Sequence, residues 1–123
     1  MNSFAFSVSM PPSANNMFAT VVIKGKVRQI ISRDYKAWKA TEAHRLVQKW
    51  QAAGSPRFAK HLALTIHLGL SYRGDIDNRV KPITDLLRAI PEFPDDRWID
   101  KIAVERVQDI VGARVLIIQG RAA

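Results

Sequence analysis

Residues 62–70 read Leu62-Ala63-Leu64-Thr65-Ile66-His67-Leu68-Gly69-Leu70, in which large apolar side chains alternate with small or polar ones. Side chains two residues apart lie on the same face of a β-strand, so the alternation predicts a strand with one buried face. This is the clearest strand pattern in the chain. We expect the strand to lie in the centre of its sheet and take it as the centre of the fold.

Acidic residues follow this strand directly, and the segment after them is predicted to form a helix. Its apolar residues recur at helical spacing and stop before Pro91; they are Ile83, Leu86, Leu87 and Ile90. Pro82 has no backbone N–H and disfavours helical angles in Lys81. We therefore expect the helix to begin near Asn78, with Pro82 within or just beyond its first turn.

The amino-terminal part predicts a strand followed by a hairpin. Phe4, Phe6 and Val8 alternate with small residues that include Ser3, Ser7 and Ser9, which is typical of a half-buried strand. The proline-rich residues 11–16 end it as a loop. Residues 18–23 and 27–31 are rich in β-branched side chains and flank Gly25, which can adopt a positive φ. These features predict a β-hairpin.

A long helix should follow the hairpin. Ser32 is a suitable N-cap, and the helix should run to about Ala53, where Gly54-Ser55-Pro56 stops it. The residues expected to face the core are Tyr35, Trp38, Ala43, Leu46, Val47 and Trp50, with Lys39 interrupting the stripe.

Strands near 102–107 and 114–118, joined by a turn around Gly112, complete the domain. The elements together predict an α+β fold: a small mixed β-sheet with two main helices packed on it. A chain of 123 residues is the size of one domain, so we expect a single domain over 1–123.

The charge distribution is uneven. Residues 24–60 contain ten Lys or Arg and only two acids, which equals the entire net charge of +8, whereas the other nine acids lie between Asp75 and Asp109. This asymmetry favours a basic surface that attracts a polyanion and an acidic centre that acts on it, although a solvated basic face would give the same count. The chain has no cysteine and no apolar run of membrane-spanning length, so we expect no membrane association and a reducing cytoplasm.

The spacing of the acidic residues is typical of a site that binds a metal ion. Asp75 and Asp77 are two apart at the end of the central strand, so in extended geometry their carboxylates share one face. A bound cation relieves the repulsion between them, and Asp95-Asp96 can close the site from the other side. Mg²⁺ takes one or two such carboxylates and fills its other positions with water and phosphate oxygens. Lys81 could then contact the scissile phosphate.

Each of these residues also has an ordinary interpretation. Asp77 or Asn78 could cap the second helix, Lys81 could form an exposed i,i+4 pair with Asp85, and Asp95-Asp96 could be turn residues. An Asp-x-Asp by itself is a weak signal. The three histidines do not stand at metal-ligand spacing, and Trp98 could either pack in the core or shape the site.

The acidic residues and Lys81, taken together with the segments around them, resemble the sequence pattern of the RusA family of Holliday-junction endonucleases. The resemblance rests on Gly74-Asp75-Ile76-Asp77-Asn78-Arg79-Val80-Lys81, on Asp85-Leu86-Leu87, on Phe93-Pro94-Asp95-Asp96 and on Pro11-Pro12-Ser13-Ala14-Asn15-Asn16. It spans nearly the whole chain and agrees with its size and order of elements.

The resemblance implies a small homodimeric enzyme from a bacterium or its phage. It would use Mg²⁺, which Mn²⁺ could replace, to resolve four-way DNA junctions by paired symmetric nicks in recombination and repair. By position, Asp75, Asp77 and Asp96 would be the catalytic, metal-binding acids and Lys81 the catalytic lysine, with Asp95 a weaker candidate.

The chain departs from the family pattern at three positions. Gly74 stands where a basic residue often precedes the first Asp, Leu86 replaces an alanine, and Pro94 directly precedes the doublet. None removes a catalytic group. Two alternatives remain open: a non-catalytic basic nucleic-acid-binding protein, and a metal-dependent nuclease with a different substrate, such as flaps or RNA.

Overall fold

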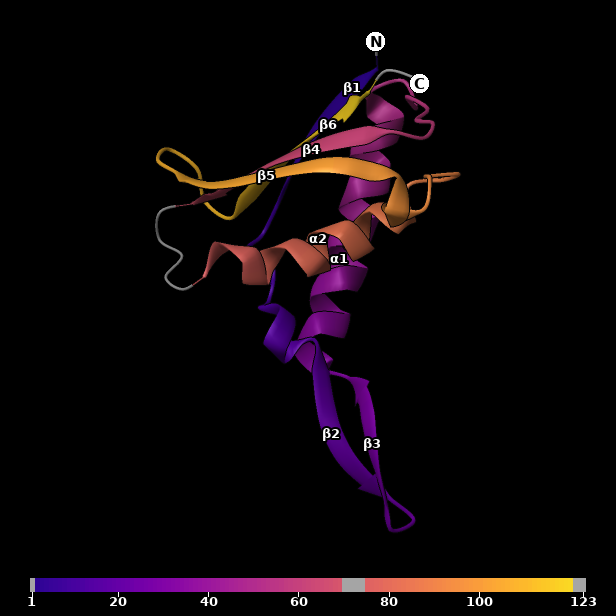
Figure 1. Cartoon of the computed structure of the whole chain (residues 1–123), viewed down its shortest axis with the longest axis vertical. Helices are drawn as coiled ribbons and strands as arrows, with labels where there is room; N and C mark the ends of the chain where they lie inside the picture. Colours follow the sequence, from indigo (N-terminus) through magenta and orange to yellow (C-terminus); the bar gives the residue numbers. More distant parts are fainter. Residues whose placement is uncertain (1, 70–74, 121–123) are drawn as a thin grey trace.

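The computed structural model describes residues 2–69 and 75–120, and its main layer is a four-stranded mixed sheet (Figure 1). The strands lie in the order β1-β6-β4-β5, with bounds Ser3–Val8 (β1), Leu62–Gly69 (β4), Ile99–Val107 (β5) and Ala113–Gln119 (β6). β4 has a neighbour on each side, which confirms the predicted central strand over its described residues. Leu70 and Gly74 lie outside the described residues.

The strand pairing of β4 determines which connection contains the acidic residues. β4 is antiparallel to β6 but parallel to β5. A parallel neighbour cannot be reached by a tight turn, so the chain must cross over between the two strands. The crossover carries four helical segments: η2 Ile76–Arg79, α2 Val80–Leu86, η3 Leu87–Ala89 and η4 Asp96–Trp98. The acidic motif and the acidic doublet therefore belong to one connection.

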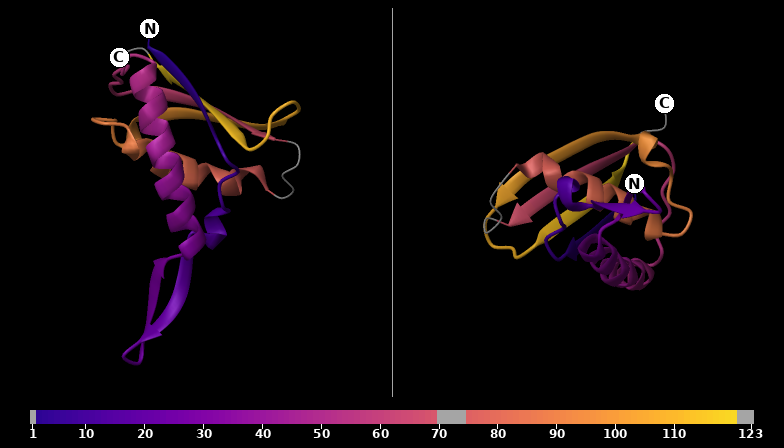
Figure 2. Two further views of the ribbon diagram at one scale, coloured as in Figure 1. Left: turned by 180° about the vertical axis from the view of Figure 1, so that it is seen from behind. Right: turned by 90° about the horizontal axis from the view of Figure 1, so that it is seen from below.

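The core lies between the sheet and its two helices, α2 and α1 (Arg33–Ala52), as Figure 2 shows. Alternate side chains of β4 are almost completely buried, as the alternation predicted: Leu62, Leu64, Ile66 and Leu68. Strands β1 and β6 add Phe4, Phe6, Val8, Val115 and Ile117 to the same core. This arrangement confirms the expected α+β fold with a mixed sheet and two main helices.

Helix α1 begins and ends where predicted. The Ser32 side chain accepts a hydrogen bond of 3.2 Å from the Tyr35 N–H, and Ala53 is the C-cap. Of the predicted core stripe, three members are buried (Tyr35, Leu46 and Trp50) and three are half-buried (Trp38, Ala43 and Val47). Glu42, 1% exposed, lies in the same stripe and was not predicted there. Within the described ranges, no helix is both long and apolar enough to span a membrane.

The second helical region agrees with the prediction but is less regular. The chain turns helical at Ile76, before Asn78, and remains so to Ala89, yet only α2 is α-helical and both flanks are 3₁₀ turns. Pro82 is the third residue of α2, where its missing N–H has no intrahelical acceptor to lose. β5 begins at Ile99 rather than at the predicted residue 102.

The predicted hairpin is confirmed and stands apart from the body. β2 (Phe18–Ile23) and β3 (Lys26–Ile31) form a separate two-stranded sheet that projects away from the helices (Figure 1). Lys24 and Gly25 both have positive φ, 52° and 77°, as a two-residue type I′ turn requires.

Candidate active site

The Asp-x-Asp motif lies at the start of the crossover. Asp75 is the N-cap residue of η2, and Asp77 lies in the first turn of that segment, with both residues exposed. Helix α2 begins only after Arg79, and no side chain caps it. The interpretation of Asp77 or Asn78 as the cap of the second helix is therefore wrong.

Lys81 connects the two acidic segments. Its Nζ atom lies 3.0 Å from Oδ1 of Asp85 and 3.9 Å from Oδ2 of Asp96. The first contact is the i,i+4 pair that the spacing suggested. The second crosses from α2 to η4, so the lysine reaches the acidic doublet as well as its own helix.

Three of the four predicted site residues line one open groove of about 350 Å³: Asp77, Lys81 and Asp96. Thr84 and Arg97 add polar groups to the groove, and the β5 residues Ile99 and Ile102 form an apolar wall. Asp75 does not belong to its lining. In residues 2–69 and 75–120, no three His, Asp or Glu side chains converge closely enough to hold a metal ion. The metal set Asp75, Asp77 and Asp96 therefore stays a prediction.

A helical run separates the two acidic segments of the crossover along the chain. The helical run 76–89 is roughly 20 Å long at about 1.5 Å per residue. η2 forms the first turn of this run, whereas η4 comes after its end. The two acidic segments therefore approach the groove from opposite ends of α2, with Lys81 between them.

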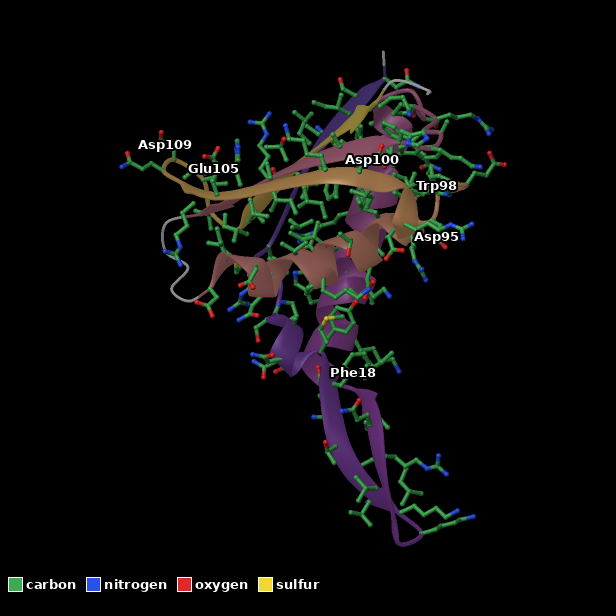
Figure 3. The ribbon with its side chains drawn as sticks, viewed as in Figure 1. Phe18, Asp95, Trp98, Asp100, Glu105 and Asp109 are labelled. Atoms are coloured by element: carbon green, nitrogen blue, oxygen red, sulfur yellow. The ribbon has the colours of Figure 1, made fainter. Side chains whose placement is uncertain are left out.

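The two members of the acidic doublet have different roles. The Asp95 side chain accepts a 3.0 Å hydrogen bond from the Arg97 N–H and caps η4. This segment lies directly before the start of β5, where Figure 3 labels Asp95 and Trp98. This backbone hydrogen bond is the main cause that lowers the pKa of Asp95; a hydrogen bond with Asp96 and the charges of Arg97 and Arg88 add to it. Asp95 is thus the turn residue, and Asp96 is the member that lines the groove.

Asp85 is held by a residue that the sequence did not point to. The hydroxyl of buried Tyr35, on α1, donates to Oδ2 of Asp85 over 3.4 Å. Burial, followed by the negative charge of Asp85 and this hydrogen bond, raises the pKa of Tyr35 to about 12. Asp85 therefore receives contacts from Tyr35 on one oxygen and from Lys81 on the other. Nothing in the spacing of residues 35 and 85 could have indicated this pair.

A comparison with protein families decides what kind of protein carries this groove. The family model for endodeoxyribonuclease RusA matches residues 9–118. The chain belongs to the RusA endodeoxyribonuclease family. Membership agrees with the α+β fold and makes the chain a DNA endonuclease. A search of curated proteins found none that matches it.

Two of the segments that carry the resemblance to RusA lie next to each other in space. Arg79, in the acidic motif, donates a hydrogen bond to the backbone carbonyl of Pro11. This contact ties the loop of residues 11–16 to η2, although the two are far apart in the chain. The role of Arg79 was missed because a single arginine in a basic sequence gives no signal of its partner.

Trp98 of this RusA chain lies outside the core and beside the doublet. Its ring meets His61 edge-on at 5.5 Å between centroids, and Nζ of Lys60 lies 4.3 Å from its centroid. His61 in turn pairs with Asp100 at 2.8 Å. These contacts support η4, which presents Asp96. Trp98 therefore neither packs in the core nor lines the groove.

Proposed function

We propose that this RusA-family endonuclease is Mg²⁺-dependent and resolves four-way DNA junctions by paired symmetric nicks, in the recombination and repair of bacterial or phage DNA. The observation that carries the proposal is the groove in which Asp77, Lys81 and Asp96 meet, within a chain of net charge +8. We assign Lys81 as a catalytic residue, and Asp75, Asp77 and Asp96 as catalytic residues that hold the ion, which Mn²⁺ could replace. Its place of action would be the bacterial cytoplasm.

The chemistry of the groove fits a hard divalent cation. Carboxylate oxygens are the ligands that Mg²⁺ prefers, and Asp77 and Asp96 both present them to the groove. A bound ion would polarise the scissile phosphate and lower the pKa of the attacking water. Lys81 is held by Asp85 at 3.0 Å and only loosely by Asp96 at 3.9 Å. Its ammonium group can therefore contact the phosphate and stabilise developing negative charge while Asp85 still positions it.

The test uses a labelled four-way junction, a linear duplex and single-stranded RNA, each with and without Mg²⁺. We expect paired nicks in the junction alone and only with Mg²⁺. Asp77→Asn and Asp96→Asn should abolish cleavage and retain junction binding. Asp109→Asn is the matched control, because Asp109 is exposed at the far end of β5 from Asp95 (Figure 3) and its positive φ of 73° suits asparagine equally.

Other results would identify the alternatives. A junction that is bound but never cut at any Mg²⁺ concentration would indicate a non-catalytic nucleic-acid-binding protein. Equal cleavage of RNA or linear duplex would indicate a nuclease with another substrate. Full activity of Asp77→Asn and Asp96→Asn would exclude this groove as the active site.

We infer that the protein acts as a homodimer, and the projecting hairpin supports this. A two-stranded ribbon is marginally stable at best in water unless something packs on it. Directly opposite residues of an antiparallel pair point to the same face, so the register divides the ribbon into two faces. One face has no charge: Phe18, Thr20, Val22, Val27, Gln29 and Ile31. The other carries Lys26 and Arg28 among Ala19, Val21, Ile23 and Ile30.

The uncharged face suits a second copy of this chain. Its apolar side chains are exposed, up to 69% for Val22 and 71% for Val27. Phe18, at its base, is labelled in Figure 3. A two-fold dimer brings the same patch of both copies together, so that patch must not repel itself. The cationic face would repel its own copy, whereas the uncharged face would not. Two symmetric subunits would present two active sites to a near-symmetric junction.

The dimer proposal is tested by molar mass in solution. Val22→Lys with Val27→Lys should shift the protein from dimer to monomer, because it places charge in the proposed contact. Ile23→Lys with Ile30→Lys, on the other face, is the control and should leave the dimer intact. A wild-type monomer at micromolar concentration, or equal effects of both pairs, would contradict the proposal.

A further inference from the structure

A second groove lies at the β1 edge of the sheet and is larger than the candidate active site. It measures about 640 Å³ and is formed between β1, helix α1 and the start of β6. Three cationic side chains line it, Arg45, Lys49 and Arg114, together with neutral polar Ser7 and Gln48. No Asp or Glu belongs to its lining within the described residues. We refer to it as the β1-edge groove.

The cations of this groove face solvent. Lys49 and Arg114 are exposed, and the side chain of Arg45 retains 66% of its accessible surface. Arg45 pairs with Glu42, whose Oε1 lies 3.5 Å from its Nη1. Glu42 is buried and already accepts hydrogen bonds of 2.6 and 3.1 Å from Ser9. One buried carboxylate thus offsets part of three exposed positive charges, which leaves a cationic surface.

The fold brings these residues together from distant parts of the sequence. Arg45 and Lys49 are four apart, so they lie on one face of α1. Arg114 is the register partner of Ser7 across the β1–β6 pair and points to the sheet face opposite the core. The groove therefore wraps around the outer edge of β1 and gathers cations from both sides of the sheet.

The β1-edge groove and the active-site groove are on opposite sides of the molecule. β1 and β5 are the two edge strands of the sheet, and the active-site groove is built on β5. Three strand spacings separate these edges, about 14 Å. The cations at β1 therefore cannot contact the phosphate that Lys81 would contact.

We propose that the β1-edge groove binds the phosphate backbone of the substrate DNA at a position remote from the cut. The proposal rests on the proposed function for the identity of the substrate. An open groove with several cations, neutral hydrogen-bonding side chains and no carboxylate matches a polyanionic strand, and phosphate contacts of this kind fix the position and orientation of a protein on DNA. Two contacts at opposite edges would orient the chain so that one backbone enters the active site.

The test measures binding of wild-type protein and variants to a four-way junction without divalent metal, over a range of salt concentrations. Lys49→Ala with Arg114→Ala should raise the Kd about tenfold or more and lower the slope of log K against log salt by about 2, roughly 0.9 per lost phosphate contact. Lys49→Arg with Arg114→Lys should restore binding.

Arg57→Ala with Lys101→Ala is the control, because it removes the same charge from exposed positions outside both grooves. Equal loss of affinity in both pairs would show that only net charge matters and would overturn the proposal, as would an unchanged Kd in the groove variant. If wild type binds junctions but cuts none, the proposed function fails while the binding comparison still tests the groove. If wild type does not bind DNA, both fail.

Discussion

Nζ of Lys81 lies 3.9 Å from Oδ2 of Asp96 and so joins α2 to η4 within the crossover between β4 and β5. This contact joins the two acidic segments that the parallel pairing places in one connection. It also makes the position of the lysine depend on the fold of the whole crossover rather than on α2 alone.

Replacing Lys81 should therefore affect chemistry more than binding. We expect Lys81→Ala to lower the single-turnover cleavage rate about 100-fold or more, the usual effect of losing one group that stabilises transition-state charge. Junction affinity should fall only slightly. Lys101→Ala, an exposed lysine on β5 outside the groove, is the control and should cleave like wild type. A Lys81→Ala variant with normal rates would remove Lys81 from the mechanism.

The buried Tyr35 predicts a specific stability change at high pH. Burial and Asp85 raise the folded-state pKa of Tyr35 from 10.0 to about 12. Between these values the unfolded chain loses the phenolic proton while the folded chain keeps it, so unfolding becomes easier as pH rises. Below pH 10 this stabilisation is fully present. Urea unfolding across pH 9–12 should show a smaller loss of stability in Tyr35→Phe than in wild type; equal slopes would contradict the assignment.

The burial of β4 predicts a large cost for truncating its core side chains. Ile66 is 0% exposed and lies among the side chains between sheet and helices. Ile66→Ala should destabilise the protein by about 2–5 kcal/mol, from lost burial and the cavity left behind. Ile102→Ala, at a residue 42% exposed on β5, should cost less than half as much in the same urea titration. Similar costs would mean that the sheet buries a different face.

Two glycines allow backbone strain to be separated from steric contact. Gly112 and Gly25 have nearly equal positive φ values, 78° and 77°. A Cβ at Gly112 would lie 2.4 Å from the carbonyl oxygen of Val8, whereas a Cβ at Gly25 would meet nothing within 4 Å. Gly25→Ala should therefore cost about 1–2 kcal/mol, the strain of the left-handed conformation alone. Gly112→Ala should cost clearly more, as thermal unfolding would show.

Much of the local structure could be predicted because it depends on near neighbours in the chain. The alternation in β4, the cap at Ser32 and the turn at Gly25 are local patterns, and all three were confirmed. The burial of Glu42 was missed, although its spacing from Tyr35 and Leu46 is helical. A rule that places apolar residues in the core does not select a glutamate whose partner, Ser9, lies in the distant loop after β1.

The candidate site was predictable in its residues but not in its arrangement. The sequence by itself determined the types of element, the position of the acidic motif after the central strand, and the residues that carry the family resemblance. Only the tertiary structure decided that β5 pairs parallel to β4, that Lys81 reaches Asp96, and that Tyr35 and Arg79 hold the crossover. The physical reason is that helices and turns form from neighbouring residues, whereas strand pairing and side-chain contacts across a core depend on which distant segments the whole chain can bury together.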